Sequence, residues 1–271
     1  MTAILKELGT RTLIMGVLNV TPDSFSDGGL FSDQATAVSH ACEMEKAGAD
    51  IIDVGGESTR PGHTPVGAEE EQRRVLPLIQ ALAPILTVPI SIDTYRAATA
   101  QAALAAGARI VNDVWGFQRD PGMPAVVAEH GAFAIVMHNR AQLNASLDIM
   151  ADLMRFFEHS LALARQAGIP DAHLILDPGI GFGKTADQNL EALRRLPELK
   201  ALGFPVLVGA SRKSVLSRFY DPQVPPRDRL FGTLGAHLAA VSRGADIVRV
   251  HDVRAHVEAC RVADTVLRTL P

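Results

Sequence analysis

The sequence predicts an α/β fold: a single (β/α)8 TIM-barrel domain over residues 1–271. Three observations favour it. Short apolar segments recur along the chain, segments with helical spacing lie between them, and a glycine follows most of the helical segments. Continuous apolar strands are typical of a parallel sheet covered on both faces. Eight strand–helix units in a chain of this length fit a closed barrel. A doubly wound open sheet remains the alternative.

Eight apolar segments have the length and aliphatic composition of buried strands. In chain order they are Thr12–Leu18, Ile51–Val54, Pro89–Ile92, Ala108–Val111, Ala132–Met137, His173–Leu176, Pro205–Val208 and Ala245–Val250. Polar residues or glycines bound each segment, so each strand is expected to be short.

Apolar residues at helical spacing predict helices between these strands. One set is Ala35, Val38, Ala41 and Cys42, a second is Val75, Leu78, Ile79 and Leu82, and a later helix carries Leu190, Leu193, Leu196 and Leu199. Glycines that can close a helix in the left-handed conformation follow at 48, 107, 131, 168, 203 and 244. The next strand begins within a few residues, which predicts short turns at one end of the barrel and longer loops at the other.

Composition excludes several classes of protein. Hydrophobic residues make up 47% and charged residues 21%, and the net charge of -4 gives no sign of a nucleic-acid partner. Cys42 and Cys260 form no C-x-x-C pair, so two reduced, packed thiols are expected. Lys6, Glu7 and Arg11 interrupt any signal-peptide core, and no apolar run has the length of a membrane span. These features predict a cytoplasmic protein with no membrane partner.

Polar groups follow the carboxyl end of every predicted strand. They are Asn19, Gly55-Gly56-Glu57, Asp93, Asn112-Asp113, His138, Asp177, Ser211-Arg212-Lys213 and Arg249 with His251-Asp252. In a parallel barrel these ends share one face, where barrel enzymes place their chemistry. Buried polar groups without partners are costly, so a ligand with many polar edges is expected.

Two loops at that face are long and rich in glycine or proline, at Thr21–Gly29 and Ser58–Gly67. Long loops at an active face often act as lids. The alternative is that both are ordinary surface connections.

Several common catalytic motifs are absent. The segment Asp177–Thr185 resembles a phosphate loop, but Pro178 stands where the first glycine is needed, and Lys184 interrupts a G-x-G-x-x-G pattern. The segment Gly209–Lys213 is not a G-x-S-x-G nucleophile elbow, and no H-E-x-x-H occurs. The sequence thus lacks the signature motifs of ATPases, dinucleotide enzymes, serine hydrolases and zinc proteases.

The motifs that are present resemble those of the dihydropteroate synthase family over nearly the whole chain. The first signature is similar to Met15–Gly29 (MGVLNVTPDSFSDGG) and the second to Gly55–Gly62 (GGESTRPG). The likeness continues through IDT at 92–94, VND at 111–113, MH at 137–138, LDPGIGFGK at 176–184, GASRK at 209–213 and RVHDV at 249–253. Tyr95-Arg96 and Asn139-Arg140-Ala141 depart from the pattern of some members, and both segments lie beside the expected site.

The resemblance implies a transferase that joins 6-hydroxymethyl-7,8-dihydropterin pyrophosphate to p-aminobenzoate, giving 7,8-dihydropteroate and pyrophosphate by a dissociative displacement. It implies a pterin site, a pyrophosphate site, a p-aminobenzoate slot and one Mg²⁺ ligand. Asp93, Lys213, Arg249 and His251 are the implied catalytic residues. The implied binding residues are Asp93, Asn112, Met137, Asp177 and Lys213 for the pterin, Arg60, Arg249 and His251 for pyrophosphate, Phe25, Thr59, Pro61, Phe182 and Ser214 for p-aminobenzoate, and Asn19 for Mg²⁺.

The resemblance further implies a homodimer that pairs through outer helices, and a target for sulfonamides, which copy the shape of p-aminobenzoate. Two alternative functions remain. One is a folate-dependent methyltransferase of the same barrel superfamily, which would keep the pterin-binding residues but has no reason to keep both long loops. The other is a catalytically silent pterin-binding protein, against which the intact lysine and phosphate-binding cations argue.

Overall fold

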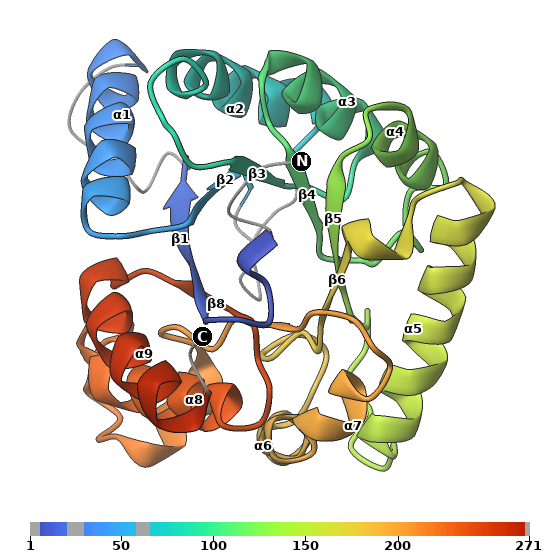
Figure 1. Cartoon of the computed structure of the whole chain (residues 1–271), viewed down its shortest axis with the longest axis vertical. Coiled ribbons are helices and arrows are strands. Elements are labelled where there is room, and N and C mark those ends of the chain that lie inside the picture. Colours follow the sequence, from blue (N-terminus) through green and yellow to red (C-terminus); the bar gives the residue numbers. More distant parts are fainter. Residues whose placement is uncertain (1–5, 21–29, 58–65, 269–271) are drawn as a thin grey trace.

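Eight parallel strands form the centre of the computed structural model, which describes residues 6–20, 30–57 and 66–268 (Figure 1). The strands are β1 Leu13–Asn19, β2 Ile51–Gly55, β3 Ile90–Asp93, β4 Ile110–Asp113, β5 Phe133–Met137, β6 Leu174–Asp177, β7 Leu207–Val208 and β8 Ile247–Val250. Their order is β6-β5-β4-β3-β2-β1-β8-β7, and a parallel bridge between Leu176 and Val206 joins β6 to β7. The sheet therefore closes into the predicted barrel.

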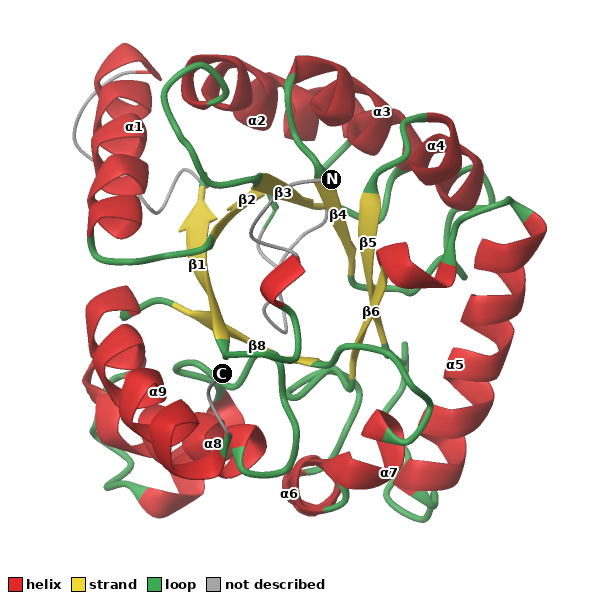
Figure 2. Ribbon diagram, viewed as in Figure 1, coloured by secondary structure: helices red, strands yellow, loops and turns green. Residues whose placement is uncertain are grey.

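Helices surround this barrel on the outside, as Figure 2 shows. They are α1 Leu30–Lys46, α2 Ala68–Leu82, α3 Ala97–Ala106, α4 Met123–Glu129, α5 Ile149–Gln166, α6 Ala186–Arg194, α7 Leu196–Lys200, α8 Leu230–Val241 and α9 Val253–Leu267. The six glycines predicted to close helices all have positive φ, between 57° at Gly131 and 124° at Gly107. In the described part of the chain no helix is long and apolar enough to cross a membrane.

Some predicted boundaries were wrong. Most strands start one or two residues later than expected, and His173 belongs to a 3-10 turn at Asp171–His173 instead of β6. The helix expected over Leu190–Leu199 is two helices that meet at Arg195. Pro197 lies in the first turn of the second one, where its missing N–H leaves no hydrogen bond unmade. Cys42 and Cys260 are free thiols on α1 and α9, as expected.

The barrel interior is divided into an apolar part and a polar part along its axis. A cluster of buried side chains fills the apolar part: Leu13, Met15, Ile51, Ile110, Phe133, Ile135, Ile175, Leu207 and Ile247. Side chains two residues apart on a strand share a face, so the next inward positions are Asp53, Asn112, Asp177 and Arg249. The strand register therefore places a polar layer directly on the apolar layer, toward the carboxyl ends of the strands.

The apolar interior should carry much of the stability of the barrel. Ile247 is fully buried, and replacing it with alanine should lower the free energy of unfolding by about 2–5 kcal/mol, because the change leaves a cavity. Ile85 is 52% exposed, so Ile85→Ala should change it by less than about 0.5 kcal/mol. Urea unfolding of both variants checks this, and equal midpoints would contradict it.

Candidate active site

Charged and amide side chains from five strands meet in the polar layer of the barrel. Asp53 comes from β2, Asp93 from β3, Asn112 from β4, Asp177 from β6 and Arg249 from β8. Asp53, Asn112 and Asp177 are buried, and Asp93 and Arg249 are half-buried. Four of these five were predicted site residues, and the structure brings them together.

Arg249 connects two of the carboxylates. Its Nε donates to Asp53 Oδ2 at 2.6 Å and its Nη2 donates to Asp93 Oδ2 at 2.8 Å. Burial opposes the charge of Arg249, but Asp53 and Asp93 raise its pKa above the usual value. Burial raises the pKa of Asp93 to about 7, although Arg249 acts in the opposite direction. Burial therefore outweighs the ion pair at Asp93, and its carboxyl group is expected to gain or lose its proton near neutral pH.

Asp53 also sets the orientation of Asn112. The Nδ2 group of Asn112 donates to Asp53 Oδ2 at 3.1 Å, so its oxygen must face elsewhere. That oxygen, Asn112 Oδ1, is buried and has no hydrogen-bond partner, and the same holds for Asp53 Oδ1 and Ser91 Oγ. A buried polar atom without a partner costs about 1–3 kcal/mol. The unpaired oxygens of Asp53 and Asn112 in the polar layer are acceptors, so they suit a ligand that carries N–H groups.

Asp177 lies at the opposite side of the mouth, where β6 ends. Gly179 N–H donates to Asp177 Oδ1 at 2.7 Å, and Met137 is its neighbour in register on β5. Burial raises the pKa of Asp177, while Lys213 and the Gly179 N–H lower it. The carboxylate thus faces the interior beside an apolar thioether, a suitable surface for a flat heterocycle with donors along one edge.

Lys213 reaches this region from the loop after β7. Its Nζ donates to Ile180 O at 2.5 Å and lies 4.5 Å from the centre of the Phe182 ring. Burial lowers the pKa of Lys213 to about 8, with Asp177 opposing the shift. Lys213 and Phe182, both predicted site residues, are therefore in contact. Ser214 begins the next 3-10 turn, Ser214–Phe219, and is exposed.

A second lysine lies behind the turn that follows β6. Lys184 Nζ donates to Gly179 O at 2.9 Å and Phe182 O at 3.1 Å, and contacts His138 Nδ1 at 2.8 Å. His138 Nε2 in turn lies 3.0 Å from Asp152 Oδ2 on α5. Lys184 was not predicted as a site residue.

The loops after β7 and β8 hold each other in place. Ser211 Oγ lies 2.9 Å from His251 Nδ1 and accepts from the His251 backbone N–H at 3.2 Å. Arg212 forms a two-point ion pair with Asp252, with the shorter contact at 2.6 Å. His251, predicted to bind pyrophosphate, is thereby fixed on the same rim as Arg249.

Asn19 ends β1 beside β2. A methyl group placed on Gly55 would lie 3.4 Å from Asn19 Oδ1 and 3.8 Å from Asp93 Oδ2, so the two oxygens border one small space. The described residues contain no cluster of three His, Cys, Asp or Glu side chains that could hold a metal. The predicted residues Phe25, Thr59, Arg60 and Pro61 lie outside the described residues.

Arg96 binds the two residues that border segment 58–65 of the second long loop. Its guanidinium donates to the Glu57 carboxylate at 2.7 Å and to the Val66 carbonyl at 2.6 Å. A contact of 3.1 Å to buried Glu71 anchors it to α2. The entry and the exit of the segment 58–65 are therefore connected through one side chain.

Sequence reasoning assigned no site role to Asp53, Lys184 or Ser211, although Ser211 was named among the polar strand ends. A signal for Asp53 was available, because a charge in an apolar strand two residues after Ile51 must face the same interior. Lys184 was named in the failed phosphate loop and in the family motif at 176–184, but no role was assigned to it. No sequence pattern indicated its contact with His138, which depends on two loops that approach in space.

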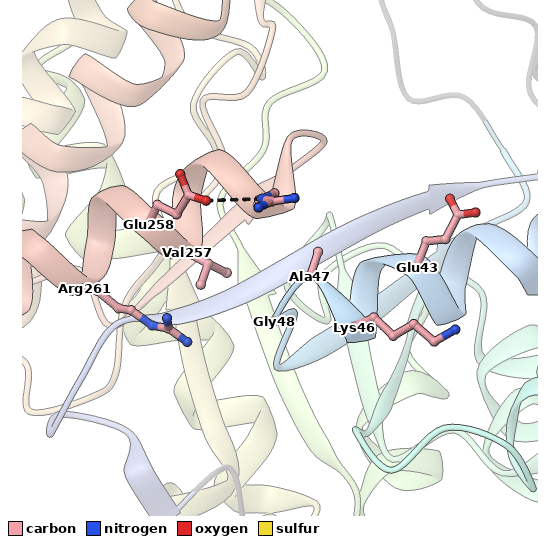
Figure 3. Close-up of a pocket in the computed structure, with 8 residues that line it drawn as sticks. Glu43, Lys46, Ala47, Gly48, Val257, Glu258 and Arg261 are labelled. Carbon is pink, nitrogen blue, oxygen red and sulfur yellow. Dashed lines mark hydrogen bonds and ion pairs between the residues drawn. The ribbon is translucent and has the colours of Figure 1, made fainter.

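A separate groove of about 530 Å³ lies on the outside of the barrel between α1 and α9 (Figure 3). Charged side chains line it, among them Glu43, Lys46 and Arg261, and Arg254 pairs with Glu258 there at 3.2 Å. Gly48, which closes α1 before β2, also lines it. The groove is thus near the amino ends of the strands, away from the polar layer, and is not the candidate active site.

Comparison with known proteins gives consistent matches. Residues 15–251 match the pterin binding enzyme family. A dihydropteroate synthase of Synechocystis sp. is 50% identical over 266 residues, which is 96% of this chain and 92% of that protein. That of Clostridium beijerinckii is 46% identical over 262 residues, which is 96% of each protein.

A crystal structure of the Clostridium difficile dihydropteroate synthase in the presence of pteroic acid has a TM-score of 0.94 and 49% identity, covering 97% of this chain and 99% of that one. The Xanthomonas albilineans dihydropteroate synthase in complex with 7,8-dihydropteroate has a TM-score of 0.87 and 40% identity, covering 96% and 95%.

The buried imidazole of His138 should make folding sensitive to acid. Burial, with Lys184, lowers its pKa from 6.5 to about 3. Between these values the unfolded chain binds a proton that the folded chain does not, so stability is lost as the pH falls from 6.5 toward 3, by up to about 2 kcal/mol at pH 5. His138→Asn should therefore lose less stability between pH 7 and pH 5 than the parent, in urea unfolding. His40→Asn, at an exposed position, is the control, and parallel pH curves for all three proteins would refute the assignment.

Proposed function

Because this chain belongs to the dihydropteroate synthase family of pterin-binding enzymes, we propose that the polar mouth of its barrel condenses 6-hydroxymethyl-7,8-dihydropterin pyrophosphate with p-aminobenzoate. The products are 7,8-dihydropteroate and pyrophosphate. The observation that carries the proposal is the set of buried polar atoms without partners inside the barrel, Asp53 Oδ1 and Asn112 Oδ1 in the polar layer and Ser91 Oγ on β3. A pterin has a row of N–H donors on one edge and acceptors on the others, which such a set can satisfy.

The pterin ring is proposed to lie between Asp177 and Asn112, over Met137. A carboxylate can accept two parallel hydrogen bonds from the ring N–H and the 2-amino group. The Asn112 amide, already turned by Asp53, presents its oxygen to a further donor. Lys213 is proposed to donate to the ring carbonyl and ring nitrogen, and Asp93 to face the reduced ring.

The pyrophosphate is proposed to bind Arg60, Arg249 and His251. Arginine forks suit phosphate oxygens, and the loops after the seventh and eighth strands of barrels commonly bind phosphate. The fixed position of His251 against Ser211 supports this site. Phe25, Thr59, Pro61, Phe182 and Ser214 are proposed to form the p-aminobenzoate slot, where the Phe182 ring packs against the Lys213 ammonium.

A Mg²⁺ ion is proposed to bind Asn19. The site fits the ion in donor chemistry, because the Asn19 amide oxygen and the Asp93 carboxylate border the same space, and Mg²⁺ prefers oxygen ligands. When bound, the ion would neutralise part of the pyrophosphate charge. With no three-residue acidic or histidine cluster among the described residues, substrate oxygens and water would complete its coordination.

The proposed chemistry is a dissociative displacement. The bond between the pterin methylene carbon and the pyrophosphate oxygen breaks, and the electron pair leaves with pyrophosphate. The arylamine nitrogen then bonds to the cationic carbon, and the amine proton passes to solvent. Arg249 and His251 stabilise the leaving group, while Asp93 stabilises positive charge on the pterin and Lys213 positions its ring. No protein nucleophile is needed.

The quaternary structure proposed is a homodimer that pairs through α8 and α9. Phe231 on α8 is 81% exposed, and Val262 and Val266 on α9 are 67% and 77% exposed. Val262 and Val266 lie one turn apart and share a helix face. Large apolar side chains on neighbouring outer helices support pairing with a second copy of the chain.

Asp177→Asn should weaken pterin binding. The amide places an N–H against the donor edge of the ring, so the variant loses a charge-assisted hydrogen bond and leaves a buried group unpaired, at a cost of about 2–4 kcal/mol. Calorimetric titration with a pterin measures this. Asp187→Asn is the matched control, since Asp187 is exposed and pairs only with Arg218 among the bonds described. An affinity for Asp177→Asn within threefold of the parent would remove Asp177 from the pterin site.

Turnover tests the function and the metal together. The purified chain with both substrates and Mg²⁺ should release dihydropteroate and pyrophosphate, and EDTA should abolish the reaction until Mg²⁺ is restored. Pterin binding without turnover would favour a silent pterin-binding protein, and methyl transfer from a folate to a corrinoid would favour the methyltransferase. Full activity in EDTA would retain the synthase and exclude the Mg²⁺ requirement.

A further inference from the structure

Three side chains outside the pterin contacts form a chain of hydrogen bonds from α5 to the turn after β6. Asp152 Oδ2 lies 3.0 Å from His138 Nε2, and His138 Nδ1 lies 2.8 Å from Lys184 Nζ. His138 is buried, Lys184 is 7% exposed, and Arg140 also donates to Asp152 at 2.7 Å. The Asp152 end of this row of hydrogen bonds borders a hollow of about 300 Å³, which His138, Arg140 and Asp152 line.

The numbers of hydrogen-bond donors and acceptors determine the protonation states of Lys184 and His138. Lys184 Nζ faces three acceptors, Gly179 O, Phe182 O and His138 Nδ1, so all three of its N–H groups are used only when it is an ammonium. His138 Nδ1 then carries no proton, and its Nε2–H donates to the Asp152 carboxylate. The buried Lys184 ammonium thus contacts one side of the neutral His138 imidazole, and the Asp152 carboxylate contacts the other side.

The turn held by Lys184 also holds the proposed pterin carboxylate. Gly179 accepts from Lys184 with its carbonyl and donates to Asp177 with its N–H. Gly179 and Gly183 have positive φ of 67° and 56°, and a methyl group on either would overlap the backbone of His138 or Arg140. The turn therefore lies directly against the segment after β5, and Gly179 connects Lys184 to Asp177 through its two hydrogen bonds.

We infer that Asp152, His138 and Lys184 are positioning residues that orient the Asp177 carboxylate toward the pterin by holding the turn at residues 178–184. The inference rests on the proposed pterin site. Deprotonation of Lys184 leaves His138 Nδ1 or a turn carbonyl without a donor, so the turn loosens and pterin affinity falls as the pH rises. Burial lowers the pKa of Lys184 to about 7, Asp177 and Asp152 raise it, and Lys213 and Arg140 lower it further.

Asp152→Asn separates this role from a purely structural one. The amide oxygen still accepts from His138, but the charge that favours the Lys184 ammonium is lost. The affinity for 6-hydroxymethylpterin, measured by calorimetry from pH 6 to pH 9, should therefore decline at lower pH than in the parent. At pH 6 the two proteins should agree within about threefold, and near pH 8 the variant should be about tenfold weaker, since one pKa unit is a factor of ten. Asp93, Lys213 and the ligand titrate in both proteins, and thus contribute equally to the two curves.

Two further variants complete the experiment. Lys184→Met should bind the pterin about tenfold more weakly at pH 6 and lack this part of the pH dependence. Asp171→Asn is the control, because Asp171 pairs with Arg165 in an exposed bridge away from the turn, and it should follow the parent curve. A decline of Asp152→Asn at the parent's pH, or an equal loss at every pH, would overturn the inference. Failure of the parent itself to bind the pterin would instead reject the proposed function.

Discussion

The ion pairs of Arg249 are the interactions on which the mouth of the barrel depends. Asp53 and Asp93 come from neighbouring strands and face the same interior, and their charges would repel each other strongly away from water. The guanidinium from β8 lies between them, across the barrel. Because Asp53 then turns the Asn112 amide, one cation determines both the charge balance and the direction of a neutral binding group. The strand register makes this possible, since it places the polar layer beside a packed apolar layer that excludes water.

The site is built at a cost to folding. Burial raises the pKa of Asp93 and Asp177 and lowers that of Lys184 and Lys213, so every one of these groups is less easily charged than in water. The unpaired oxygens of Asp53 and Asn112 add to this cost. Such groups persist because the surrounding barrel is stable enough to hold them. A ligand that donates hydrogen bonds to these oxygens removes the free-energy cost of leaving them unpaired. A rigid site can bind a small polar ring well in this way.

Much of the fold was predictable, because it follows from local patterns. Apolar periodicity located all eight strands, and the glycines closing the helices were identified correctly at Gly48 and its counterparts. The polar strand ends predicted Asp93, Asn112 and Asp177. Asp53 was overlooked because it lies two residues before the end of its strand, inside an apolar segment. The contacts of Lys184 with His138 and Asp152 could not be predicted, since they depend on the close approach of segments from β5, α5 and the turn after β6.

Arg96 has a consequence for how this enzyme can change over evolution. The segment 58–65 departs from Glu57 and returns at Val66, and both flanking residues are bound to the same guanidinium, which α2 holds through Glu71. The entropy of closing a loop grows only with the logarithm of its length, so added or deleted residues change that cost little once the ends are fixed. Changes in the length of this segment should therefore cost the barrel little folding stability.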